Sequence, residues 1–117
     1  MKRILFFLVC LYGVTPAFAE DMPIVGVGNQ SCEVWNKWRA EENNAVNTLL
    51  SEWVQGFLSG MNARSYVLSG MKEDSMYPLP NQQIVNAYLD KYCMQNVSDD
   101  LFGAALTLFY EVEEGAK

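Results

Sequence analysis

Apolar side chains recur about every 3.6 residues in four stretches of the chain, which is the spacing of one face of an α-helix. The stretches predict helices at roughly 32–41, 45–68 and 82–94, and a fourth that begins after residue 98. The pattern is strongest in 45–68, where it lasts for more than four turns. No two stretches alternate as paired strands would. We therefore predict an all-α fold with four helices in one small domain, residues 31–117.

The same pattern predicts which face of each helix turns inward. The apolar positions of 45–68 are Val46, Leu49, Leu50, Trp53, Val54, Phe57, Leu58 and Met61. Helix 82–94 has two neighbouring stripes, Ile84, Tyr88 and Tyr92 beside Val85, Leu89 and Cys93. In the last helix we expect Leu101, Ala104, Ala105, Leu108 and Val112 to face inward.

Capping residues set the predicted helix ends. Ser31, Asn81 and Ser98 are suitable N-caps for the first, third and fourth helices, because their side-chain oxygens can accept from free backbone N–H groups. Gly70 can adopt the left-handed conformation just past the end of the second helix. Two prolines in the following loop prevent that helix from continuing.

Two glycines lie four residues apart inside the strongest helix. Each costs a helix interior about 1 kcal/mol relative to alanine, so close packing of another helix is the expected compensation. Gly56 and Gly60 would form a flat groove with Trp53 and Phe57 as its walls. We expect the partner to be the last helix of the same chain, which has small residues at 103–105. The alternative is the same groove of a second chain, which would make a homodimer.

The segment 69–80, between the second and third helices, is unusually apolar for a loop. Its apolar side chains are Met71, Met76, Tyr77 and Leu79. We interpret them as a candidate partner-binding loop.

The N-terminus has the pattern of a bacterial-type secretory signal. Lys2 and Arg3 precede an apolar run that is too short to span a bilayer, and Ala17 and Ala19 supply small residues at the cleavage site. We predict a signal peptide at 1–19, cut after Ala19, an irregular arm at 20–30 and a periplasmic product.

Charge limits the kind of partner. The chain has 8 basic and 14 acidic side chains, and loss of Lys2 and Arg3 with the signal would leave 6 basic ones and a net charge of −8. Since no basic cluster remains, nucleic acid and membrane surfaces are not expected partners of the mature chain. The expected partners are therefore protein clients or a single, basic protein.

Cysteine count predicts one cross-link. After cleavage only Cys32 and Cys93 remain, and two cysteines in an oxidising compartment indicate a disulfide. So long a closed loop would stabilise the fold by roughly 4 kcal/mol. A metal site is the alternative, but the chain has no histidine and no C-x-x-C spacing, so we expect no metal and no cofactor.

Two motifs resemble those of a known family. "SCEVW" places an aromatic soon after an early cysteine, and "KYCMQN" ends a helix with Tyr-Cys-x-x-Asn before a short amphipathic helix. This frame is similar to the HdeA/HdeB family of small periplasmic acid-stress chaperones, over roughly residues 30–110. The resemblance implies that Cys32 and Cys93 form that family's single disulfide, and Trp53 loosely matches its aromatic second helix.

No catalytic pattern accompanies this frame. The chain lacks histidine, and the paired glutamates at 41–42 and 113–114 are adjacent, so their side chains point in different directions. We therefore expect no enzyme and no catalytic residue. The first functional hypothesis is an acid-responsive chaperone that exposes apolar surface when a dimer dissociates at low pH. The alternative is a periplasmic immunity or inhibitor protein that blocks a cell-wall hydrolase.

Overall fold

The computed structural model describes residues 24–117, so the predicted signal peptide and residues 20–23 lie outside the described part. The four main helices are α1 (Cys32–Ala40), α2 (Asn44–Leu68), α3 (Gln82–Gln95) and α4 (Leu101–Gly115). Two short 3-10 helices, η1 (Gly26–Asn29) and η2 (Glu73–Ser75), lie between or before them. No strand is assigned within 24–117 apart from one isolated bridge, and the predicted all-α fold with four helices is confirmed.

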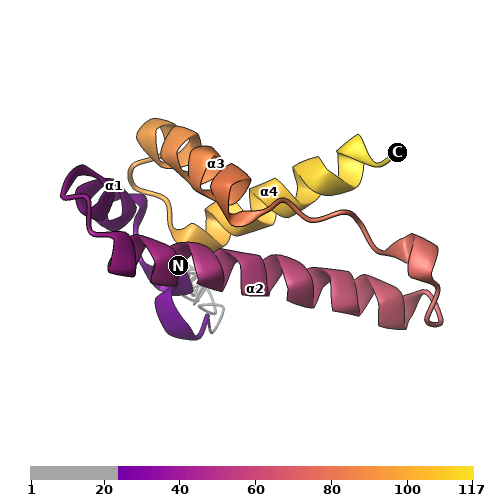
Figure 1. Ribbon diagram of the computed structural model, residues 1–117. Helices are drawn as coiled ribbons and strands as arrows, with labels where there is room; N and C mark the ends of the chain where they lie inside the picture. The colour runs from indigo at the N-terminus through magenta and orange to yellow at the C-terminus, as the bar shows by residue number, and fades with distance from the viewer. Residues whose placement is uncertain (1–23) are drawn as a thin grey trace, which may run out of the picture.

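The longest helix, α2, is the base on which the others pack (Figure 1). Helices α3 and α4 lie on one side of α2, while α1 lies near its N-terminal end and against α3. The short η1 contacts α2 and α4. The C-terminal half of α2 extends towards the loop that contains η2.

The core lies between α2, α3 and α4 and is closed by α1. Its buried apolar side chains are Cys32, Trp35, Leu50, Val54, Leu58, Val85, Leu89, Cys93, Leu101, Ala104, Ala105, Leu108 and Phe109. The inward stripe predicted for α4 is confirmed, with Val112 partly buried at its end. Of the two stripes predicted for α3, the one with Leu89 is buried, whereas Ile84 in the other is 54% exposed.

A disulfide joins the beginning of α1 to the end of α3. The Cα atoms of Cys32 and Cys93 are 4.7 Å apart, within the range that a disulfide bridges, and the predicted cross-link is confirmed. Because the bond ties the first residue of one helix to the end of another, it fixes the register in which α1 and α3 run past each other.

Local caps begin the helices, with one correction at α4. Ser31 accepts from the backbone N–H of Val34, and Asn81 does the same for α3, as predicted. The N-cap of α4 is Asp100, which accepts from Gly103 at 2.7 Å, and not Ser98. Backbone hydrogen bonds from Cys32 to Asp99 and from Leu101 to Gln30 hold Asp100 extended, so the helix begins two residues later than expected.

Backbone conformation explains how α2 ends and how the arm is built. Gly70 has φ +78, which is the left-handed conformation predicted for it. The arm was expected to be irregular, but Gly26–Asn29 forms a 3-10 helix.

Candidate functional site

The two glycines of α2 lie on the face that points away from the core. Among residues 24–117, no heavy atom of another element lies within 4 Å of a Cβ built at Gly56 or Gly60. The predicted packing of α4 into this groove is therefore wrong. The reason is the rotation of α2, because Leu58 is fully buried and the glycines lie about 160° around the helix from it.

The small residues of α4 make other contacts. Its two alanines are fully buried in the core. The place of a side chain at Gly103 is already taken, since its Cβ would lie 2.7 Å from a carboxylate oxygen of Asp99. Helix α4 instead meets the side of α2 through Phe102, whose ring lies edge-on to Phe57 with centroids 5.5 Å apart.

Trp53 binds the N-terminal arm. Its Nε1–H donates to the carbonyl of Val25 at 3.0 Å, and its ring stacks on Phe57 with centroids 5.8 Å apart. A Cβ at Gly28 would come within 2.1 Å of the indole, so the arm can approach this closely only because residue 28 is glycine. The two aromatic walls predicted for the groove are thus partly covered, while its glycine floor is open.

Large apolar side chains remain exposed along the outer side of α2 and into the next loop. They are Leu49, Val67, Leu68, Met71 and Met76, and we call this set the α2 apolar surface. Leu49 is 55% exposed and Val67 62%, which is unusual for apolar side chains on a regular helix of a small domain. Leu49 lies near the N-terminal end of α2, while the other four lie within ten residues of one another at its C-terminal end and in the next loop. Clusters of exposed apolar side chains such as these four often bind another protein.

The loop predicted to bind a partner divides into two parts. Tyr77 and Leu79 pack against the core, whereas Met71 and Met76 are exposed. Asn62 fixes Tyr77 through two hydrogen bonds, donating to its carbonyl at 2.7 Å and accepting from its N–H at 3.0 Å. Only the two methionines are therefore available to a partner in this conformation.

Met71 has an uncommon backbone conformation. Its φ is +65, directly after the left-handed Gly70, and its side chain is 67% exposed. A non-glycine residue in this region carries a cost of about 1 kcal/mol or more. The turn therefore presents an apolar side chain to solvent at some expense in stability.

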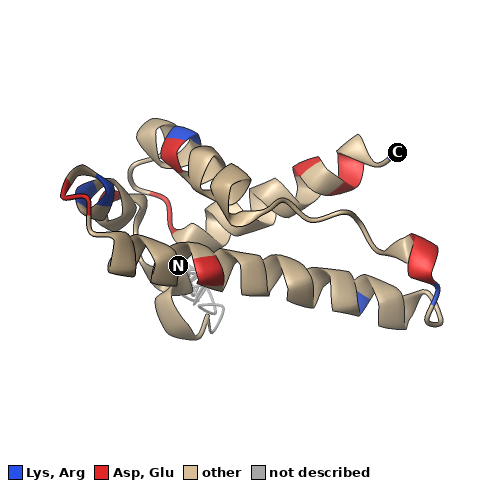
Figure 2. Ribbon diagram, viewed as in Figure 1, with Lys and Arg blue, Asp and Glu red and all other residues tan. Residues whose placement is uncertain are grey.

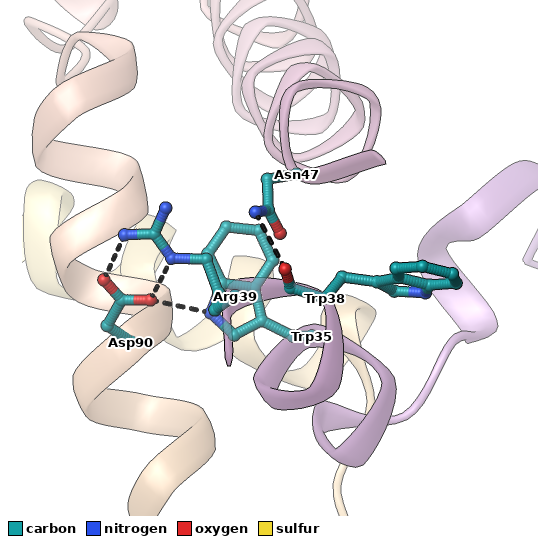
Figure 3. A network of polar contacts seen from close by, with 5 residues as sticks. All are labelled: Trp35, Trp38, Arg39, Asn47 and Asp90. Carbon is teal, nitrogen blue, oxygen red and sulfur yellow. Dashed lines mark hydrogen bonds and ion pairs between the residues drawn. The ribbon is translucent and has the colours of Figure 1, made fainter. Parts of the chain in front are cut away.

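A network of polar side chains links α1 to α3 (Figure 3). The carboxylate of Asp90 accepts from Trp35 Nε1 at 2.9 Å and from Arg39 Nε and Nη2 at 2.8 and 2.7 Å. The hydrogen bond to Asp90 is the main reason why the pKa of Arg39 is raised. Beside it, Asn47 of α2 donates to the carbonyl of Trp38 at 3.3 Å. This network and the disulfide hold the same pair of helices.

The Asp90 network was not predicted, but the sequence contains a signal for it. Trp35 lies three residues after Cys32, and Asp90 three residues before Cys93. In two helices that run antiparallel from one disulfide, these positions come opposite each other. Once Cys32 is paired with Cys93, the sequence therefore predicts that Trp35 and Asp90 are neighbours.

Three tyrosines donate hydrogen bonds to carboxylates of the α4 region. Tyr77 bonds Glu113 at 3.2 Å, Tyr88 bonds Glu111 at 3.3 Å, and Tyr92 makes a short bond to Asp99. Burial raises the pKa of Tyr77, Tyr88 and Tyr92, and the nearby carboxylates raise it further. These bonds tie α4 to α3 and to the loop.

Within residues 24–117 the titratable side chains do not gather into a metal centre. No group of three or more histidine, cysteine, aspartate or glutamate side chains is placed to bind an ion. None of the helices described for residues 24–117 combines the length and the apolar character that crossing a bilayer needs.

Comparison with known proteins adds no relative. No protein-family model, no curated protein and no solved structure matches the chain.

Proposed function

We propose that this chain is an exported, non-enzymatic binding protein that acts as an acid-responsive chaperone. The proposed neutral-pH form is a homodimer. Acid dissociates it and exposes apolar surface, to which unfolding client proteins bind. The proposal uses no cofactor and no metal. The cysteine frame that resembles the HdeA/HdeB family supports it, together with the contacts described next.

The observation that carries the proposal is that carboxylates hold the elements together. Asp90 links α3 to α1, Glu111 links α4 to α3, and Glu113 links α4 to the loop. The chain has no histidine, so carboxylates are the side chains that change charge between pH 7 and 2. Protonation of these carboxylates in acid removes the charge of each acceptor and so weakens all three links.

The bond between Glu113 and Tyr77 couples acid to apolar surface. Protonation of Glu113 weakens this bond, because the acceptor loses its charge. Tyr77 covers Phe109 in an edge-to-face pair with centroids 5.9 Å apart. Loosening the loop would add the buried ring of Phe109 to the α2 apolar surface, which is exposed in the single subunit.

The disulfide limits how far the subunit opens. It ties α1 to α3 and does not titrate, so these helices stay together after Asp90 is protonated. Acid would then produce a loosened but compact subunit, which is the form in which a small chaperone can hold clients without unfolding itself.

The experiment is suppression of client aggregation as a function of pH, with Glu113→Gln as the test variant. Glutamine resembles the protonated acid, so we expect the variant to protect an acid-sensitive client at a higher pH than the wild type does. Glu114→Gln is the matched control, because the side chain of Glu114 makes no hydrogen bond among residues 24–117.

Two results would contradict the proposal. A wild-type protein that fails to suppress aggregation at any pH between 2 and 7 is not an acid-responsive chaperone. If Glu113→Gln and Glu114→Gln protect over the same pH range as the wild type, the loop contact is not part of the switch.

The exposed turn at Met71 favours a second candidate, a periplasmic immunity or inhibitor protein. An apolar side chain held outward in a left-handed conformation on an acidic domain could insert into a basic hydrolase. This function requires a tight complex with one protein at neutral pH that weakens as salt is added. The chaperone instead binds many clients and does so in acid.

A further inference from the structure

The outer face of α2 has a symmetric order of residues about Leu58. Gly56 and Gly60 lie two positions to either side of it, and Glu52 and Arg64 lie six positions to either side. Leu49 and Val67 are nine positions away in the two directions. Counted outward from Leu58 in either direction, these positions hold a glycine, then a charged residue and then a large apolar residue. The charged residue is glutamate on the N-terminal side and arginine on the C-terminal side.

These positions share one side of the helix. At about 100° per residue, Leu49 and Val67 point directly away from Leu58, and the two glycines lie within about 20° of that direction. Glu52 and Arg64 lie about 60° to either side of it. Since Leu58 is fully buried, the whole set lies on the exposed side of the helix, and within the described part of the chain no atom of another element comes within 4 Å of a Cβ built at either glycine.

The charges of α2 are confined to this arrangement. Glu52 and Arg64 are its two charged residues, which appear as single red and blue positions along the helix in Figure 2. Neither side chain makes a hydrogen bond or an ion pair with another residue of 24–117. The ion pair within those residues joins Arg39 and Asp90, which lie on other helices. An acidic or a basic partner would match one of them and oppose the other, but an inverted copy of the same helix matches both.

We infer that α2 is a dimerisation helix, on which α2 of a second copy packs antiparallel with the glycines at the point of closest approach. A two-fold axis beside Leu58 brings Glu52 of each subunit to the level of Arg64 of the partner subunit. It also brings Leu49 opposite Val67 of the partner subunit. The contact is isologous, so each favourable pair forms twice.

The two glycines allow Glu52 to reach Arg64 of the partner subunit. Glu52 and Arg64 lie on opposite flanks of the face, so their side chains reach across the seam only if the two helices approach closely. Four unfilled Cβ positions at the centre permit that approach. The larger side chains at 49 and 67 then close the two ends, about 27 Å apart along the helix.

Trp53 fits the same register. Its position is matched by Ala63, so the bulky indole of one subunit comes opposite a methyl group of the other. Val25, which is bonded to the indole and 84% exposed, lies at the edge of this face and adds apolar area there.

This inference rests on the proposed function, which needs a dimer at neutral pH, and it specifies how that dimer is built. Its test uses association at neutral pH without any client protein. If the wild type is a dimer that the charge reversals do not affect, this interface is wrong while the proposed function stands. If the wild type is a monomer at pH 7, both are wrong. The aggregation assay tests the proposed function without depending on which surface forms the dimer.

The test is charge reversal followed by mixing, measured by sedimentation velocity at pH 7. Glu52→Arg places arginine opposite Arg64 of the partner subunit, and Arg64→Glu places glutamate opposite Glu52. We expect each variant alone to dimerise about tenfold more weakly than the wild type. Mixed in equal amounts, the two variants have every pair restored, so a heterodimer with wild-type affinity should form.

The controls are Glu114→Arg and Lys91→Glu, which reverse exposed charges on α4 and α3. These variants, alone or mixed, should associate as the wild type does. Circular dichroism checks that all four variants fold. A wild-type protein that is monomeric at pH 7 would overturn the inference. So would a dimer unaffected by either reversal at α2, or weakened variants that do not recover on mixing.

Discussion

Gly56 and Gly103 are both helical glycines, but an added side chain would meet different surroundings at each. Gly56 faces open space, so Gly56→Leu should stabilise the monomer by about 1 kcal/mol through helix propensity. Gly103→Leu should destabilise it, because Asp99 occupies the place of the Cβ. Thermal melts at a concentration where the chain is monomeric check both signs. A lower melting temperature for Gly56→Leu would mean that the glycine face is packed within the subunit.

Single residues also show what the sequence can predict. Ser31, Asn81 and Gly70 were placed correctly, because a cap or a left-handed turn depends on neighbours within four residues. The helix that Gly56 would contact was predicted wrongly. Periodicity places glycine near the edge of an apolar stripe, but the rotation of α2 against its neighbours decides which edge is covered.

At the scale of elements, tyrosines join α4 to α3 and the loop, and they predict an alkaline limit to stability. The pKa of Tyr77, Tyr88 and Tyr92 is raised in the fold, so the folded state retains protons that the unfolded chain releases above about pH 10. The contribution of these tyrosines to stability is therefore fully present below about pH 10 and is lost as pH rises beyond it.

Chemical denaturation at pH 9 and pH 11 measures this fall. Tyr88→Phe should lose less stability over that interval than the wild type, because it removes one of the groups whose pKa is raised. Tyr110→Phe is the control, since Tyr110 is 53% exposed and its hydroxyl makes no hydrogen bond among residues 24–117. An equal loss in both variants and the wild type would contradict the argument.

The beginning of α4 shows why element boundaries are harder to predict than elements. Ser98 and Asp100 are both suitable N-caps, and local sequence does not choose between them. The choice is made by backbone bonds to Gln30 and Cys32, which are distant in sequence and hold Asp100 extended. The carboxylate contacts of Asp90, Glu111 and Glu113 depend on helix packing in the same way, so periodicity alone does not reveal them.

For the whole molecule, charge opposes association in acid. With residues 1–19 removed as predicted, the chain would carry 6 basic and 14 acidic side chains, and its net charge would change from −8 at pH 7 to about +6 once the carboxylates are protonated. Protonation of Glu52 removes the proposed attraction to Arg64 of the partner subunit, while the remaining positive charges repel. Salt screens that repulsion, so added salt at low pH should partly restore the dimer.

The most direct test of this account is the association state of the protein between pH 7 and pH 2.5, measured by sedimentation velocity with an apolar dye as a second probe. We predict a dimer at pH 7 and a compact, disulfide-bonded monomer at pH 2.5 that binds the dye. A monomer at pH 7, or the same association state at both pH values, would contradict the account and favour the inhibitor.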